Sequence, residues 1–345
     1  MLALSLLGGL GCGLEKTGYS DPCPEGEDCD PSGDRDGATP PSDDDDAGSA
    51  PRRDAGPTPP TPPRDAGPSS GPDSATPPPP PAPPVPPPPP PPAPGDGLRF
   101  VRYDATRADE DPSWGSVLTD IAQHLPPDYG WMYWDSDLIT AAHETTHGIN
   151  SDIRNYHNDT GRRANGFYVL ENRAVLIVEP AIRKSDANRF VPAALRGSRY
   201  DLYLEGSPDW DDTPTYLFDE WVAYTNGGAV GVDLVRSGLW TYGWRDGVAG
   251  QLEFTVYALA VAMAVEEGDA TYWASPDGAQ FREFVAWNAR RAMTLYREGA
   301  TFPDFAWDEQ DSYYARMRTG EDAAAMRSFV ERVWGAALAR EIFGE

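Results

Sequence analysis

Proline is concentrated at one end of this chain: of 37 prolines among 345 residues, 28 lie before residue 95. A segment so dense in proline favours the extended polyproline II conformation, above all in the nearly pure proline tract at 77–94. The same segment is rich in Asp, Gly and Ser, which bury too little apolar surface to offset the entropy of ordering. We therefore expect residues 13–97 to form a disordered acidic and proline-rich linker ahead of a folded domain at 98–345.

The charge of the chain disfavours nucleic acid as a partner. Its formal net charge is −27, and residues 1–97 account for −11 of it, with 16 acidic and five basic side chains, which leaves −16 for residues 98–345. A surface this negative repels phosphate backbones and anionic lipid headgroups, so we expect no direct binding to either. The sequence contains no apolar run of transmembrane length.

The first residues are typical of an export signal. Residues 1–11 are mostly apolar and end at Cys12, a length that suits a signal peptide, although no Lys or Arg precedes Lys16. Leu10-Gly11-Cys12 resembles the lipobox of bacterial lipoproteins, in which a small residue precedes a lipidated cysteine. The resemblance implies an exported protein, held at the outer membrane or cell surface by a lipid on Cys12 alone. A secreted protein with an ordinary signal and an incidental cysteine is the alternative.

The three cysteines form an odd set for an exported protein. If Cys12 carries a lipid, Cys23 and Cys29 remain, and the short loop between them can close as a local disulfide outside the cytosol. The folded domain then contains no cysteine. A metal bound there would need histidine and carboxylate ligands rather than thiolates.

Hydrophobic periodicity predicts an α+β domain, with a small mixed sheet and an active-site helix followed by a mainly helical half. Strands are expected at 98–103 and 130–134, with a hairpin at 167–178 turned at 171–173. Helices are expected at 113–125, from Asp137 onward with Asp135 or Ser136 as cap, and at 217–225, 249–267, 277–298 and 321–342.

The segment His143-Glu144-Thr145-Thr146-His147 lies in the helix that begins near Asp137. Residues four apart share a helix face, so His143 and His147 can present two imidazole nitrogens to one cation, with zinc the expected metal. Glu144 then lies beside the metal, where it can take a proton from a polarised water. A surface helix with two solvated histidines is the alternative. The aliphatic residues 139–142 favour a buried helix instead, in which unpaired imidazoles would be costly.

A catalytic zinc site needs a third protein ligand. The metzincin pattern would place a histidine six residues after His147, where this chain has Ile153. The segment 218–224 resembles the second ligand helix of the gluzincins, zinc peptidases with a downstream glutamate ligand, and this resemblance points to Glu220. His157 and Asp219 are the alternatives, and Asp219 can instead support a ligand.

Together the two motifs resemble the zincin metallopeptidases. The resemblance implies a zincin-like fold at 98–345 and a zinc-dependent peptidase that acts on a peptide or protein substrate, with Glu144 as general base. Tyr224 stands where gluzincins often carry a supporting aspartate, so it is a candidate to orient a ligand or stabilise an oxyanion, or else a core residue. Tyr203 and Tyr242 are further candidates. The rival functions are a non-proteolytic zinc hydrolase, a pseudo-enzyme, or a surface-anchored binding lipoprotein with a fortuitous motif.

Overall fold

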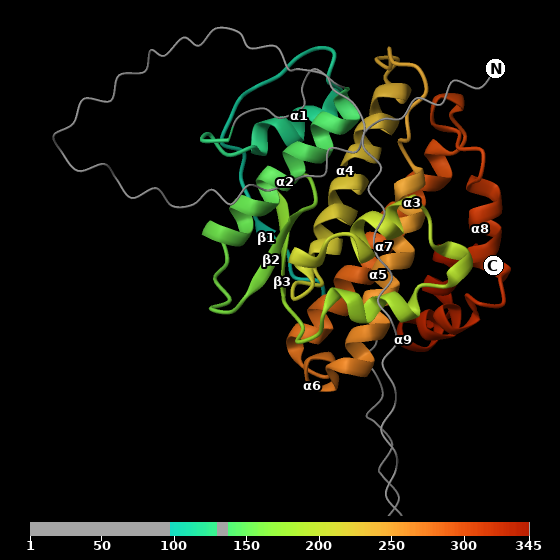
Figure 1. Cartoon of the computed structure of the whole chain (residues 1–345). Coiled ribbons are helices and arrows are strands. Elements are labelled where there is room, and N and C mark those ends of the chain that lie inside the picture. Colours follow the sequence, from blue (N-terminus) through green and yellow to red (C-terminus); the bar gives the residue numbers. More distant parts are fainter. Residues whose placement is uncertain (1–96, 130–136, 345) are drawn as a thin grey trace, which may run out of the picture. The chain divides into compact units, whose positions relative to one another are not determined.

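Helices make up most of the described chain, residues 97–129 and 137–344, in this computed structural model (Figure 1). The strands are β1 (Val101–Arg102), β2 (Ala164–Tyr168) and β3 (Arg173–Val178). The helices are α1 (Gly115–His124), α2 (Leu138–Tyr156), α3 (Ser198–Tyr200), α4 (Tyr216–Arg236), α5 (Ala249–Gly268), α6 (Ala270–Trp273), α7 (Pro276–Gly299), α8 (Gln310–Thr319) and α9 (Ala324–Phe343).

The sheet of the described residues has three strands in the order β1-β3-β2. Both pairings are antiparallel, so the expectation of a mixed sheet is wrong for this part of the chain. β2 and β3 form a hairpin, and its turn holds Leu170, Glu171 and Asn172 at positive φ, one residue earlier than the turn expected at 171–173. The α+β class is confirmed in its coarse form, a mostly helical domain with one small sheet.

Helix α2 begins one residue later than expected, because Asp137 itself is the cap. Its side chain accepts a hydrogen bond from the Thr140 backbone N–H at 2.7 Å, which satisfies one of the free donors of the first turn. Leu138, Ala142, Ile149 and Ile153 share one buried face, in a hydrophobic cluster with residues of α1 and the sheet. This face fixes the rotation of α2, so that Ile139 and His143 lie against Gly227 of α4.

Helix α4 runs to Arg236, eleven residues beyond the expected end at residue 225. Three glycines, at 227, 228 and 231, suggest a break in the sequence, but here they allow close packing. A Cβ at Gly227 would lie 3.1 Å from the carbonyl oxygen of Ile139, and one at Gly231 would lie 2.8 Å from the Ile139 Cδ1. Tertiary contact therefore overrides the weak helix propensity of glycine and brings α4 against α2.

Three helices of the helical half match their sequence pattern closely. Helices α5, α7 and α9 follow the expected segments within three residues at each end, whereas α8 was not predicted. Almost every residue of α5 is buried, and it packs with α4 and α7 in the larger of the two hydrophobic clusters (Figure 1). The short strand β1 covers only part of the expected segment 98–103.

Several predictions from the sequence lie outside the described residues. These are the export signal at 1–12, the linker at 13–97 except for its last residue, the cysteines Cys12, Cys23 and Cys29, and the strand at 130–134 with the caps Asp135 and Ser136. Among the helices that are described, none combines the length and apolar character needed to cross a bilayer.

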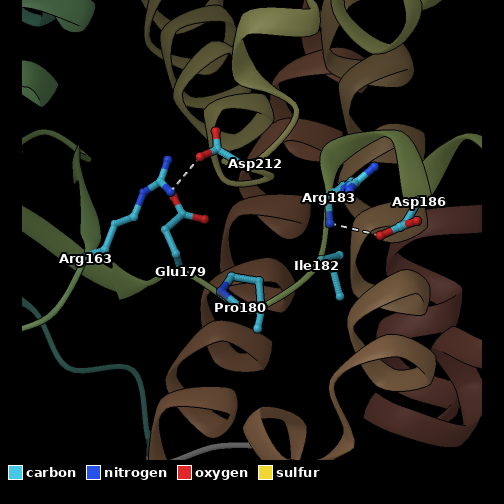
Figure 2. Close-up of a pocket in the computed structure, with 8 residues that line it drawn as sticks. Arg163, Glu179, Pro180, Ile182, Arg183, Asp186 and Asp212 are labelled. Atoms are coloured by element: carbon cyan, nitrogen blue, oxygen red, sulfur yellow. Dashed lines mark hydrogen bonds and ion pairs between the residues drawn. The ribbon is translucent and has the colours of Figure 1, made fainter.

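Glu179 links the end of β3 to the start of α4. Its carboxylate accepts hydrogen bonds from the side chains of Asn165 and Thr215, and Thr215 is the residue that precedes α4. Glu179 also lines a surface depression of about 500 Å³ together with Arg163 and Asp212 (Figure 2). Burial raises the pKa of Glu179 to about 7, against the opposing effect of Thr215.

We predict that Glu179 makes folding stability depend on pH. Because its pKa is higher in the folded chain than in the unfolded chain, its stabilising contribution is complete below about pH 4.5 and is lost as pH rises through about 7. Urea denaturation should therefore show Glu179→Gln gaining stability relative to wild type between pH 5 and pH 8, by up to about 3 kcal/mol. An identical difference between the two proteins at both pH values would contradict this role.

Candidate metal centre

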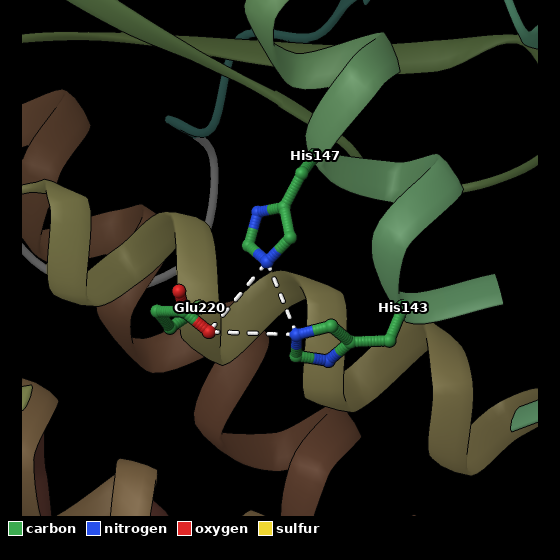
Figure 3. Close-up of side chains that lie close together, drawn as sticks. All are labelled: His143, His147 and Glu220. Atoms are coloured by element: carbon green, nitrogen blue, oxygen red, sulfur yellow. Dashed lines mark hydrogen bonds and ion pairs between the residues drawn. The ribbon is translucent and has the colours of Figure 1, made fainter. Parts of the chain in front are cut away.

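Three predicted ligand side chains converge between α2 and α4. Figure 3 shows the imidazoles of His143 and His147, from α2, pointing toward the carboxylate of Glu220, from α4. The two Nε2 atoms are 3.1 Å apart, and Glu220 Oε2 lies 3.5 Å from that of His143 and 3.6 Å from that of His147. Within the described residues, this is the group of histidine and acidic side chains with the geometry to hold a metal ion.

These separations fit one small cation. With zinc–ligand bonds of about 2.0–2.1 Å and tetrahedral angles, ligand atoms stand about 3.3 Å apart. The three observed distances, 3.1, 3.5 and 3.6 Å, lie on either side of that value. The side chains therefore need only small movements to bind a tetrahedral ion.

The Glu220 carboxylate supports the same interpretation. Its Oε2 atom is buried and accepts no hydrogen bond from the described residues. An unsatisfied buried carboxylate oxygen is costly in a folded protein. The side chains of His143 and His147 are 13% and 15% exposed, against 5% for Glu220, so solvent reaches the group from the histidine side.

Asp219 holds His147 from the other side. Its Oδ2 lies 3.3 Å from Nδ1 of His147, which leaves Nε2 directed at Glu220. Asn150, one turn after His147, donates to Asp219 at 2.5 Å and accepts from the backbone N–H of Tyr168 at 2.7 Å. Asp219 thus lies at the second ring nitrogen of His147, outside the group of His143, His147 and Glu220, and Asn150 connects it to the sheet.

The site carries a negative potential that favours a cation. Burial opposes a charge on His147, but Glu220 and Asp219 outweigh it and raise the pKa of His147 well above its ordinary value. Burial likewise opposes a charge on Glu220, but His147 and His143 lower the pKa of this carboxyl far enough to keep it ionised. Either a proton on the histidines or a metal ion between them can therefore balance the negative charge of these two carboxylates.

Glu144 is buried on α2, adjacent to His143 in the chain and 9% exposed. His157, the alternative ligand, lies elsewhere: its side chain is 51% exposed and its Nε2 pairs with Asp152 at 3.2 Å. It caps the C-terminal end of α2, directly after Tyr156, and is not part of the group formed by His143, His147 and Glu220 among the described residues.

The three tyrosines named as candidates differ in position. Tyr224 contacts His143, with ring centroids 4.6 Å apart, and Tyr203 interacts with Tyr224. Tyr242 packs against Trp240 instead. Sequence reasoning missed Asn150, although its place three residues after His147 puts it on the same helix face and was a usable signal.

Comparison of the chain with protein-family models, with curated proteins and with solved structures finds no match. The likeness to zincin metallopeptidases therefore stays a prediction carried by two short motifs.

Substitution of Asp219 tests whether its contact with His147 strengthens zinc binding. We expect Asp219→Asn to weaken zinc binding by roughly 10- to 100-fold, because the neutral amide no longer fixes the imidazole or raises its basicity. Affinity is measured by competition with a chromophoric chelator. The exposed Asp209→Asn removes the same charge at the surface and should bind as wild type does. Equal affinities for both variants would show that Asp219 has no such role.

Proposed function

We propose that this chain is an exported, zinc-dependent metallopeptidase. The observation that carries the proposal is the convergence of His143, His147 and Glu220 at separations suited to a tetrahedral ion, with the carboxylate of Glu144 on the same helix. Three protein ligands leave one position of a tetrahedral ion for water or substrate, which is the arrangement of catalytic rather than structural zinc sites.

Each side chain has a distinct part in this proposal. His143, His147 and Glu220 would hold the ion, and Asp219 keeps His147 oriented toward it. When bound, zinc acts as a Lewis acid that lowers the pKa of water and polarises a substrate carbonyl. The Glu144 carboxylate accepts the proton of the water that attacks the peptide carbonyl and delivers it to the leaving amine.

The place of action follows from the N-terminal residues. An export signal with a lipid on Cys12 would keep the domain outside the cytosol, where a disulfide between Cys23 and Cys29 also persists. The linker at 13–97 would then hold the catalytic domain away from the membrane, with extracytoplasmic peptides or proteins as substrates. A zinc hydrolase of another bond has the same ligands, so the substrate screen must include more than proteins.

Glu144→Gln separates catalysis from metal binding. We expect this variant to keep its fold and about one zinc per chain, yet lose hydrolysis by at least about 100-fold, because it removes only the proton acceptor. The assay uses protein, peptide and cell-wall substrates with the full-length chain. Zinc binding without cleavage of any of them, in wild type and variant alike, would favour a pseudo-enzyme. Substantial hydrolysis by the variant would contradict the role of Glu144.

A further inference from the structure

His143 is oriented differently from its partner. His147 has a carboxylate, Asp219, at its second ring nitrogen, whereas among the described residues no carboxylate pairs with Nδ1 of His143. The contact it has instead is aromatic. The ring of Tyr224 meets the imidazole at 4.6 Å between centroids and 79° between planes, an edge-to-face geometry. Tyr224 lies four residues after Glu220, on the same face of α4.

The Tyr224 ring is itself held by the start of α5. Phe254 stacks on it, with centroids 4.7 Å apart and planes 29° apart. One turn earlier, Gly250 brings its backbone so close that a Cβ there would lie 2.5 Å from the Tyr224 Cδ1. This approach is possible because glycine has no side chain, so α5 limits the movement of the ring directly.

Arg199 contacts the same ring. Its guanidinium carbon lies 5.0 Å from the Tyr224 ring centroid, a cation–π distance. Arg199 is fixed in turn by two carboxylates of the α5 region, Asp246 and the almost fully buried Glu253. A planar cation held by two acids is a rigid surface for an aromatic ring.

We propose that Tyr224 is a positioning residue, whose ring, clamped by Gly250, Phe254 and Arg199, sets the orientation of the His143 imidazole for the metal. The inference rests on the proposed metal site and adds to it the means by which the first histidine is aligned. It assigns Gly250 and Arg199, which do not contact the ligands, a part in metal affinity. The gain in metal affinity comes from pre-organisation, because an imidazole that is already in position loses less conformational freedom when it binds the metal.

Gly250→Ala tests the clamp without changing any side chain of the site. The added methyl must displace the Tyr224 ring and with it His143, so we expect zinc affinity to fall roughly tenfold or more. Gly243→Ala is the matched control, because a Cβ at Gly243 meets nothing within 4 Å. Zinc affinity of the full-length variants is measured by chelator competition, and the unfolding midpoint of the metal-free proteins is recorded alongside.

A second pair of variants keeps the proposal testable if Gly250→Ala does not fold. Tyr224→Phe retains the ring and should bind zinc nearly as tightly as wild type, whereas Tyr224→Leu should lose roughly tenfold or more. Rescue by Phe distinguishes an aromatic contact from a role of the hydroxyl. The cobalt-substituted proteins should show the same order of metal affinity. Their visible spectrum should be altered in Gly250→Ala and Tyr224→Leu.

The outcomes separate the two proposals. Wild-type affinity in Gly250→Ala and Tyr224→Leu, with zinc bound normally by the parent chain, would overturn the positioning role and leave the metal site intact. A loss of affinity that only follows a loss of metal-free stability would overturn it also. If the parent chain binds no zinc, both proposals fail together.

Discussion

The close packing of α4 against α2 is the contact on which the proposed metal centre depends. The proposed ligands come from two helices and lie about 75 residues apart in sequence, and their side chains are too short to bridge a wide gap. Gly227 and Gly231 allow the approach, because any side chain at either position would meet Ile139. The hydrophobic cluster on the buried face of α2 and the larger cluster that contains α5 keep the two helices in place.

This approach places acidic and basic groups together in a largely buried space. Glu220 and Asp219 meet two imidazoles there, and the charges are stable only while each group has a partner. Within the cluster, Glu220 Oε2 is left without a hydrogen bond. A divalent cation at the three ligand atoms satisfies that oxygen and neutralises the carboxylates, which gives the cluster an electrostatic reason to bind metal.

The parts predicted best from the sequence are those set by local spacing. The relation of His143 to His147 depends only on helix geometry, and the hairpin turn, at residues 170–172, lies one residue from the expected 171–173. Glu220 was selected through a resemblance, and the structure brings it to the histidines. The length of α4 was missed because its glycines weaken helix propensity, while their packing against Ile139 is visible only in the folded chain.

Long-range contacts explain what the sequence did not predict. Arg199 and Gly250 have no local pattern that connects them with His143, since their link passes through the ring of Tyr224. The prediction of a mixed sheet was wrong because strand direction depends on chain topology, which alternating hydrophobicity does not define.

The central claim is that His143, His147 and Glu220 bind zinc. Its most direct test is the metal content of the purified full-length chain by mass spectrometry, compared with His143→Ala and Glu220→Ala. We expect about one zinc per wild-type chain and loss of zinc in both variants. Zinc retained in Glu220→Ala would contradict the third ligand, and no zinc in the wild type after reconstitution would contradict the metal centre itself.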